Sequence, residues 1–211
     1  MFSGIIEQQS KILNVVEKST SVQIIVQRPT SFNDIELGDS ICVNGVCLTA
    51  ENLTEHSITF SLGIETLKFL NQSFDTWKSK SLNLERSLKF GDRVHGHLVT
   101  GHVDQLGKVI SSEQSGECWL LTIALNENQN NLGVVWKKGS IAINGISLTV
   151  NDVVKSTEGV LLSVCLIPET IQKTNLSSYG TGDFVMIETD YLAKAYFNKQ
   201  ALSEPKNEIV P

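Results

Sequence analysis

Two short segments contain the residues best suited to chemistry, and their sequences are nearly the same. Residues 43–49 read VNGVCLT and residues 143–149 read INGISLT, so Cys47 in the first corresponds to Ser147 in the second. A thiol is a potent nucleophile, whereas a hydroxyl more often only binds. The replacement of cysteine by serine suggests two similar ligand sites with different chemistry.

The first segment contains a second cysteine beside the candidate nucleophile. Its Asn-Gly pair predicts a type I′ hairpin, in which Cys42 and Cys47 are cross-strand neighbours with Cβ atoms roughly 4.5–5.5 Å apart. Ala142 and Ser147 hold these positions in the second segment. Two alternatives to a reactive thiol stay open: small side chains that fill a tight space, and a disulfide, which a reducing compartment disfavours.

Three of the four histidines, His95, His97 and His102, lie within eight residues of one another. His95 and His97 would share one face of a strand, which is compatible with a zinc site, but no third ligand is marked and ordinary imidazoles are commoner. His102 replaces the apolar Ile5 of the other half of the chain. Because imidazole titrates near neutral pH, His102 is a candidate for general acid–base catalysis, with a hydrogen-bonded core histidine as the alternative.

These residues belong to a sequence that repeats itself. Four blocks match in the same order at offsets of 97 to 104 residues, which chance similarity would not produce. The blocks are FSGIIEQQSKI (2–12) with VTGHVDQLGKV (99–109), DSICVNGVCLTA (39–50) with GSIAINGISLTV (139–150), IETLKFLNQSF (64–74) with PETIQKTNLSSY (168–179), and SLNLE (81–85) with FVMIE (184–188). We infer an internal duplication.

Each half has the pattern of short β-strands, with apolar and more polar residues alternating over 21–26 and 121–125. Many short strands without a sustained helical period predict a small closed barrel in each half. Residues 65–70 and 169–174 could each form one helical turn.

The chain after the repeat has a different pattern. Residues 190–202 have helical spacing, with Asp190 as the expected N-cap and a stripe of Leu192, Ala195, Tyr196 and Lys199. We expect the polar tail over 203–211 to be disordered.

The composition is that of an ordinary globular protein, with 211 residues, 41% apolar and 19% charged residues and a net charge of -6. An acidic chain is a poor candidate for nucleic acid or an anionic membrane, and no segment approaches the ~20 apolar residues of a membrane span. The N-terminus lacks the basic region of a secretory signal and the four cysteines form no C-x-x-C, so we expect a cytoplasmic protein with free thiols. No phosphate-binding glycine loop and no Ser-His-Asp order stands out.

Five motifs together resemble the riboflavin synthase family over residues 1–190. They are MFSGII, NGVCLT, LNLERSLKFGDRVHGHLVTGHVD, NGISLTV and LIPETIQKTNL. The resemblance implies two tandem six-stranded Greek-key β-barrels, an all-β fold with domains over 1–97 and 98–189, followed by a helix over 190–202 that helps to form a homotrimer. Two departures, His95 in place of a glycine and KFLNQS in place of a TNLG motif, leave Cys47 and His102 unchanged.

The resemblance also implies a transferase reaction. Two molecules of 6,7-dimethyl-8-ribityllumazine exchange a four-carbon unit to give riboflavin and 5-amino-6-ribitylamino-2,4-pyrimidinedione, where the N-terminal barrel of one subunit meets the C-terminal barrel of its neighbour. No metal, flavin or nicotinamide cofactor is implied, and lumazine synthase is suggested as a protein partner. Nucleic acid and membranes are not expected partners.

A mechanism follows as a hypothesis. His102 would move a proton of the acidic C7 methyl group, and Cys47, Ser147 or water would supply the nucleophile at C7 of the second lumazine. The hydroxyls of Thr49 and Thr149 are suited to the pyrimidine edge. Much of the rate would come from holding the two rings stacked.

Matching the family motifs residue by residue assigns two pockets. The N-terminal pocket would use Phe2, Gly4, Ile5, Ile6, Ser40, Cys47, Leu48, Thr49, Ser61, Leu62, Gly63, Ile64, Glu65, Thr66, Gly101, His102 and Val103. The C-terminal pocket would use Lys138, Ser147, Leu148, Thr149, Ile167, Pro168, Glu169, Thr170, Ile171 and Gln172. The catalytic candidates among them are His102, Cys47, Ser147 and Ser40.

Two rival functions remain. A non-catalytic lumazine or flavin carrier of the same fold would tend to lose the Cys-His pair, which this chain keeps. A small-barrel nucleic-acid binder is disfavoured by the net charge of -6 and by an aromatic content of 7%.

Overall fold

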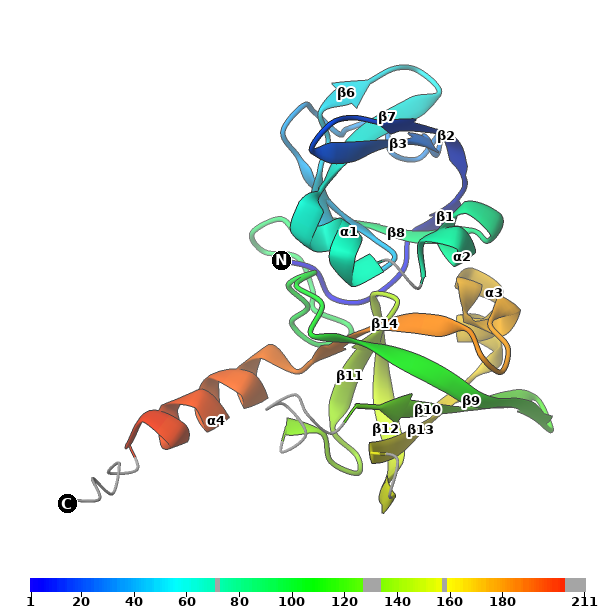
Figure 1. Ribbon diagram of the computed structural model, residues 1–211, viewed down its shortest axis with the longest axis vertical. Helices are drawn as coiled ribbons and strands as arrows, with labels where there is room; N and C mark the ends of the chain where they lie inside the picture. Colours follow the sequence, from blue (N-terminus) through cyan, green and yellow to red (C-terminus); the bar gives the residue numbers. More distant parts are fainter. Residues whose placement is uncertain (71–72, 127–133, 157–158, 204–211) are drawn as a thin grey trace.

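The computed structural model describes residues 1–70, 73–126, 134–156 and 159–203, and it contains two β-barrels stacked along the longest axis of the molecule (Figure 1). The N-terminal barrel lies above the C-terminal barrel in this view, and the last helix extends away from the lower barrel. The all-β architecture predicted from the repeat is confirmed.

The described residues of the two halves form matching series of strands with short helices between them. In the first half these are β1 (Gln8–Ser10), β2 (Ile12–Glu17), β3 (Ser21–Gln27), β4 (Ser40–Val43), β5 (Val46–Thr49), β6 (Asn52–Leu53), β7 (Ser57–Gly63), α1 (Ile64–Leu70), α2 (Phe74–Ser79) and β8 (Leu82–Arg86). In the second half they are β9 (Gln105–Ser115), β10 (Cys118–Leu125), β11 (Ser140–Ile143), β12 (Ile146–Ser156), β13 (Gly159–Leu166), α3 (Pro168–Lys173), the 3₁₀ turn η2 (Asn175–Ser178), β14 (Phe184–Thr189) and α4 (Tyr191–Ser203). The two expected helical turns are α1 and α3.

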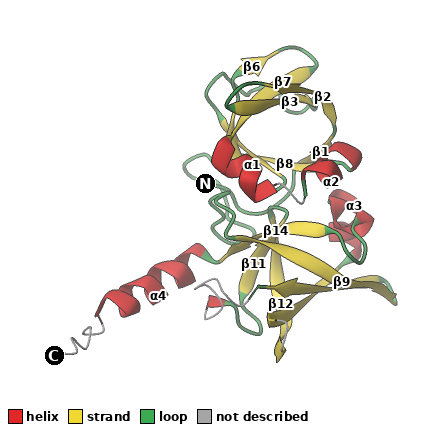
Figure 2. Ribbon diagram, viewed as in Figure 1, coloured by secondary structure: helices red, strands yellow, loops and turns green. Residues whose placement is uncertain are grey.

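The C-terminal strands close into a barrel in the order β10-β13-β12-β11-β14-β9. The N-terminal strands follow the same order, but two long strands are each divided: β1 with β2 matches β9, and β5 with β6 matches β12. This division gives two four-stranded sheets, β1-β8-β4-β5 and β2-β3-β7-β6. Figure 2 labels β1 and β8 of the first sheet and every strand of the second. Main-chain bonds continue across one division, since the N–H of Gln27 donates to the carbonyl of Lys11 at 2.9 Å.

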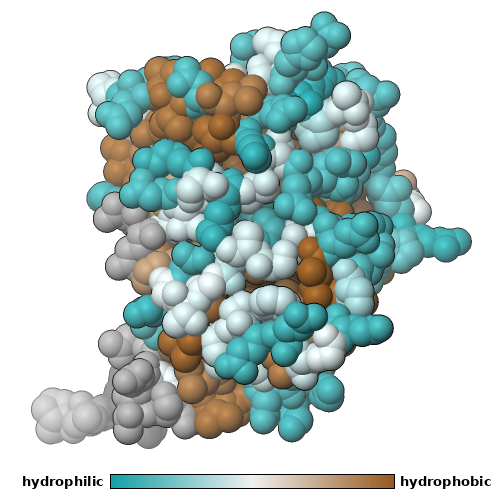
Figure 3. Space-filling view, turned by 90° about the vertical axis from the view of Figure 1, so that its right-hand side faces the viewer, coloured by the Kyte–Doolittle hydropathy of each residue, from teal (hydrophilic) through white to brown (hydrophobic). Residues whose placement is uncertain are grey.

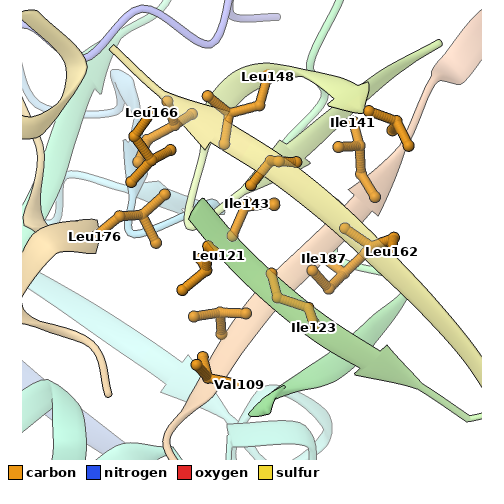
Figure 4. Close-up of a cluster of buried hydrophobic side chains, with 14 of the residues drawn as sticks. Val109, Leu121, Ile123, Ile141, Ile143, Leu148, Leu162, Leu166, Leu176 and Ile187 are labelled. Carbon is orange, nitrogen blue, oxygen red and sulfur yellow. The ribbon is translucent and has the colours of Figure 1, made fainter. Parts of the chain in front are cut away.

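Strand alternation fills each barrel with apolar side chains. Leu121 and Ile123 of β10 point into the C-terminal core, where they pack with Leu162 and other apolar residues (Figure 4). Ile24 and Val26 of β3 belong to the N-terminal core. Because these side chains are fully buried, truncating one such as Leu162 to Ala should cost about 2–5 kcal/mol.

The two Asn-Gly turns form the predicted hairpins. Both residues of each turn have positive φ, at 50° and 92° in the first and 48° and 79° in the second, as a type I′ turn requires. The predicted register is confirmed, since Cys42 pairs with Cys47 and Ala142 pairs with Ser147.

The hairpin turns meet at the junction of the two barrels. A Cβ atom on Gly45 would lie 2.8 Å from the main-chain nitrogen of Gly145, so this approach requires glycine. Beside the turns, the buried Asn83 amide donates to Asn175 Oδ1 at 2.9 Å and to the carbonyl of Asn144 at 3.0 Å. Direct polar contacts therefore fix the barrels to each other.

The segments that precede the first strand of each barrel exchange places at this junction. Phe2 and Val99 form a β-bridge, with N–H to carbonyl distances of 2.8 and 3.0 Å. Beyond the bridge, Ile6 enters the core of the C-terminal barrel and Val103 packs against the core of the N-terminal barrel. Each barrel is thus completed by a segment of the other half.

Helix α4 starts at the predicted cap. The Asp190 carboxylate accepts the N–H groups of Leu192 at 2.8 Å and Ala193 at 3.2 Å, and Lys194 binds Asp104 of the C-terminal barrel at 3.0 Å. Farther along, Tyr196 is exposed. Residues 204–211 of the expected disordered tail lie outside the described residues. A span long and apolar enough to cross a membrane is not found among the described helices.

Candidate functional site

The first candidate site surrounds Cys47 on β5. The Cys47 N–H donates to the carbonyl of Gly101 at 2.9 Å, so the segment before β9 lies directly against the hairpin. His102 follows and is exposed, and the Cys47 side chain is half-buried. The structure therefore brings the predicted thiol and imidazole residues to the same edge of the N-terminal barrel.

The second candidate site surrounds Ser147 on β12. The Ser147 N–H donates to the carbonyl of Gly4 at 2.8 Å, and its Oγ lies 2.7 Å from Nδ1 of His97. His97 is 9% exposed, and this burial lowers the pKa of its imidazole, which favours the neutral form. A neutral imidazole can either accept a proton from the Ser147 hydroxyl or donate a hydrogen bond to it.

Two Gly-His pairs, Gly96-His97 and Gly101-His102, lie against Ser147 and Cys47, respectively. A Cβ on Gly101 would lie 2.6 Å from the Cβ of Cys47, and a Cβ on Gly96 would lie 2.6 Å from the Cβ of Ser147. Each glycine lets the chain pass against one reactive residue, and a histidine follows each glycine. Sequence reasoning considered His97 as a zinc ligand or an ordinary imidazole and gave it no part in the reaction, although the repeated Gly-His pair was a visible signal.

The structure places Gly4 beside the C-terminal hairpin, whereas the sequence assigned Gly4, Ile5 and Ile6 to the N-terminal pocket. Because the N-terminal segment crosses to the other barrel, a Cβ on Gly4 would lie 2.6 Å from the Cβ of Ser147. Ile5 and Ile6 instead line an open groove of about 590 Å³ with Gln172 of α3. Gly4 and Ile6 therefore lie against the C-terminal barrel, while Ile5 also lines a second groove with Glu85 and Arg86 of the N-terminal half.

Phe2 lies behind both sites. It is fully buried in a small cluster with Cys42, Val99 and Ala142, against which Cys47 packs. Burial raises the pKa of the Cys42 thiol, so the packing explanation fits Cys42, while the half-buried Cys47 is accessible.

The other predicted residues divide by exposure. Ser40 pairs with Thr49, and both side chains are at least partly exposed. The partly or fully exposed residues of the first pocket near α1 are Ser61, Gly63, Ile64, Glu65 and Thr66, and those of the second pocket are Lys138, Thr149, Ile167, Pro168, Glu169, Thr170, Ile171 and Gln172. By contrast, Leu48, Leu62 and Leu148 belong to the barrel cores, so only their main chains are available to a ligand.

Lys138 has an unfavourable backbone conformation. Its φ is +68°, and the equivalent residue of the first half is Gly38 with φ of +92°. The N–H of Lys138 donates to the carbonyl of Val150 at 2.8 Å, and the N–H of Gly38 donates to the carbonyl of Ala50 at 2.9 Å, so the two turns are closed in the same way. A lysine held at a position that favours glycine costs roughly 1–2 kcal/mol, which supports a role for its side chain.

The sequence pattern of His95 and His97 was compatible with zinc, although ordinary imidazoles were judged commoner. His95 is exposed, and His97 uses Nδ1 to bind Ser147. Across the described ranges, no group of three His, Cys, Asp or Glu side chains is arranged to hold a metal ion.

Sequence reasoning also missed Glu85 and Glu188. Both are buried, and both hold main-chain N–H groups of the exchanged segments. The signal was present, because the matched blocks SLNLE and FVMIE end on these two residues.

Comparisons with known proteins agree with this geometry. The lumazine binding domain family matches residues 3–87 and again 100–190. A riboflavin synthase of Actinobacillus pleuropneumoniae is 35% identical over 99% of this chain and 95% of its own length. The riboflavin synthase of Escherichia coli (strain K12) is 33% identical over 90% of this chain and 87% of its own length.

A solved structure has the same fold. LumP complexed with 6,7-dimethyl-8-(1'-D-ribityl) lumazine superimposes with a TM-score of 0.74 at 20% identity, covering 90% of this chain and 99% of LumP. The two matched lumazine binding domains and the full-length similarity at over 30% identity establish that the chain belongs to the riboflavin synthase family.

Proposed function

We propose that this protein catalyses the dismutation of two 6,7-dimethyl-8-ribityllumazine molecules to riboflavin and 5-amino-6-ribitylamino-2,4-pyrimidinedione. The observation that carries the proposal is the retained thiol and imidazole at one barrel edge, where the Cys47 N–H binds the carbonyl that precedes His102. A carrier has no need for this pair. Family membership over the full chain supports the same transferase activity.

Each pocket binds one lumazine, and the two pockets have different roles. His102 takes a proton from the C7 methyl group of one lumazine, since an exposed imidazole can exchange it with solvent. The resulting carbanion attacks the second lumazine, whose C7 is activated by a nucleophile from Cys47, Ser147 or a water that they hold. The His97 imidazole next to Ser147 gives that hydroxyl a base within hydrogen-bond distance.

The productive site is shared between copies of the chain in a homotrimer. Helix α4 extends from the C-terminal barrel and exposes Tyr191 and Leu192, which suits contact with another copy (Figure 1). Apolar surface is also gathered over the N-terminal barrel, in the upper part of Figure 3. Stacking of the two rings at such an interface supplies the orientation that the reaction needs.

The enzyme works in the cytoplasm. Four free cysteines support a reducing compartment. The half-exposed Cys47 thiol in particular needs to stay reduced to react.

The decisive experiment gives the purified protein only 6,7-dimethyl-8-ribityllumazine and follows riboflavin fluorescence. Formation of riboflavin with release of the pyrimidinedione in equal amounts supports the enzyme. Tight binding of the lumazine without product would favour the carrier function instead.

A further inference from the structure

Two buried glutamates hold the exchanged segments in equivalent ways. Glu85 at the end of β8 accepts the Ser3 N–H at 2.7 Å, the Ser3 hydroxyl at 2.8 Å and the Gly4 N–H at 3.0 Å. Both carboxylate oxygens are used. The bonds join β8 to the segment that lies on the C-terminal barrel.

Glu188 of β14 repeats the pattern in the second half. It accepts the Thr100 N–H and the Thr100 hydroxyl, both at 2.7 Å, and the Gly101 N–H at 2.9 Å. Glu85 and Glu188 are only 3% and 2% exposed, and both oxygens of each carboxylate are occupied by these bonds. Their effect on a site therefore passes mainly through the residues that they hold.

The connections cross between the barrels. Glu85 belongs to the N-terminal barrel, but Gly4 accepts the N–H of Ser147 in the C-terminal barrel at 2.8 Å. Glu188 belongs to the C-terminal barrel, but Gly101 accepts the N–H of Cys47 in the N-terminal barrel at 2.9 Å.

Each glutamate also reaches a histidine through the same segment. The Thr100 hydroxyl, which donates to Glu188, accepts the N–H of His102 at 3.2 Å. The Ser3 carbonyl, next to the N–H that Glu85 binds, accepts the N–H of His97 at 3.2 Å.

We propose that Glu188 is a positioning residue for the Cys47–His102 site and Glu85 a positioning residue for the Ser147–His97 site, each acting on the barrel to which it does not belong. The inference rests on the proposed function for its catalytic part only. In both cases the carboxylate fixes a Ser/Thr-Gly turn, and the turn fixes a hairpin residue and a histidine.

The chemistry of the contacts requires a carboxylate. Three donors converge on each group, and an ionised carboxylate has only acceptors to offer them. Burying such a charge is costly unless its bonds are made, so its presence at both equivalent positions indicates a purpose beyond filling space. Glutamine would turn an NH₂ group toward a main-chain N–H and release part of the segment.

Amide hydrogen exchange followed by NMR tests directly whether each glutamate positions a residue in the other barrel. In Glu188→Gln we expect the Cys47 amide to exchange at least tenfold faster while the Ser147 amide stays within about twofold of its rate. In Glu85→Gln we expect the reverse. Asp183→Asn is the matched control, since Asp183 accepts the Gly180 N–H at 2.9 Å and pairs with Lys80 at 3.3 Å but contacts neither exchanged segment, and it should change neither amide.

Milder variants cover the case in which a glutamine variant does not fold. Thr100→Ala and Ser3→Ala each remove one of the three donors and should give the same crossed pattern with smaller rate changes. Equal acceleration of both amides, acceleration in the glutamate's own barrel, or no change would each overturn the proposal.

Steady-state kinetics test the catalytic part. Glu188→Gln should lower kcat at least tenfold with KM changed by less than about threefold, because the substrate-contacting residues remain. An unchanged kcat would overturn the positioning role in catalysis. If the parent protein makes no riboflavin, the proposed function fails, while the exchange pattern still decides whether the segments are held crosswise.

Discussion

A single methyl group at Gly101 should disrupt the contact that joins the two halves of the first site. Gly101 has φ of +77°, and an added Cβ would lie 2.6, 2.7 and 2.9 Å from the Cβ, N and Cα atoms of Cys47. The left-handed conformation alone costs alanine roughly 1–2 kcal/mol. Because the close atoms belong mainly to backbone, the segment must move and leave the Cys47 N–H unpaired, which costs about 1–3 kcal/mol more.

The expected total for Gly101→Ala is about 3 kcal/mol, or a fall in Tm of roughly 6–12 °C for a chain of this size. The displacement also moves His102, and a misplacement of about 1 Å can reduce kcat by ~100-fold. Thermal unfolding at one fixed protein concentration measures the first effect, and riboflavin formation well below both transitions measures the second.

Gly116→Ala is the matched control for backbone strain. Gly116 has φ of +64°, but an added Cβ would meet no atom within 4 Å. We expect a loss of about 1 kcal/mol and full activity, because only the conformational cost applies. If both variants lose the same stability and keep the same kcat, the close approach of Gly101 to Cys47 does not matter and the reasoning fails.

Four further outcomes can be measured. His102→Gln should slow turnover more than it weakens lumazine binding, and equal activity would exclude His102 as the proton acceptor; Cys47→Ser should fold with a reduced rate, whereas an unchanged rate would mean that Cys47 only packs. Burial raises the pKa of Glu85 from 4.5 to about 6, so the folded state holds this proton more tightly than the unfolded state does. The free energy of unfolding should therefore lose about 2 kcal/mol from this group as pH rises from roughly 4 to 7, and urea titrations of Glu85→Gln should lack that loss; the same pH dependence in both proteins would contradict the shift. Deletion of residues 190–211 should give smaller particles in sedimentation, and an intact trimer would refute the role of α4.

Local structure could be predicted where residues close together in the sequence determine it. The Asn-Gly turns fixed the hairpin register, because few other residue pairs accept two positive φ angles. Alternation placed Ile24 and Leu121 in the cores, since a strand turns every second side chain to the same face. Asp190 was identifiable as a cap because its carboxylate needs only the next turn of its own helix.

The exchange of segments could not be predicted by the same reasoning. The repeat shows that Gly4 corresponds to Gly101, but correspondence does not say which barrel each residue touches. That choice depends on the meeting of the two hairpin turns and on the bridge between Phe2 and Val99, which are contacts between distant parts of the chain. The family motifs assigned both segments to the N-terminal pocket. That assignment agrees with the place of Gly101 beside Cys47, but Gly4 lies beside Ser147 of the C-terminal barrel.

Because the two segments are exchanged, each candidate site needs residues from both halves of the chain. A boundary between residues 97 and 98, as expected from the sequence, would separate Cys47 from Gly101 and His102. The same cut would separate Ser147 from Gly4, whose carbonyl binds its N–H at 2.8 Å. Each half carries one hairpin and the segment that contacts the other hairpin, so both halves of the chain contribute to each candidate site. The duplication therefore gives two candidate sites with contacts from both halves of the chain, and the two buried glutamates bind the segments that cross between the barrels.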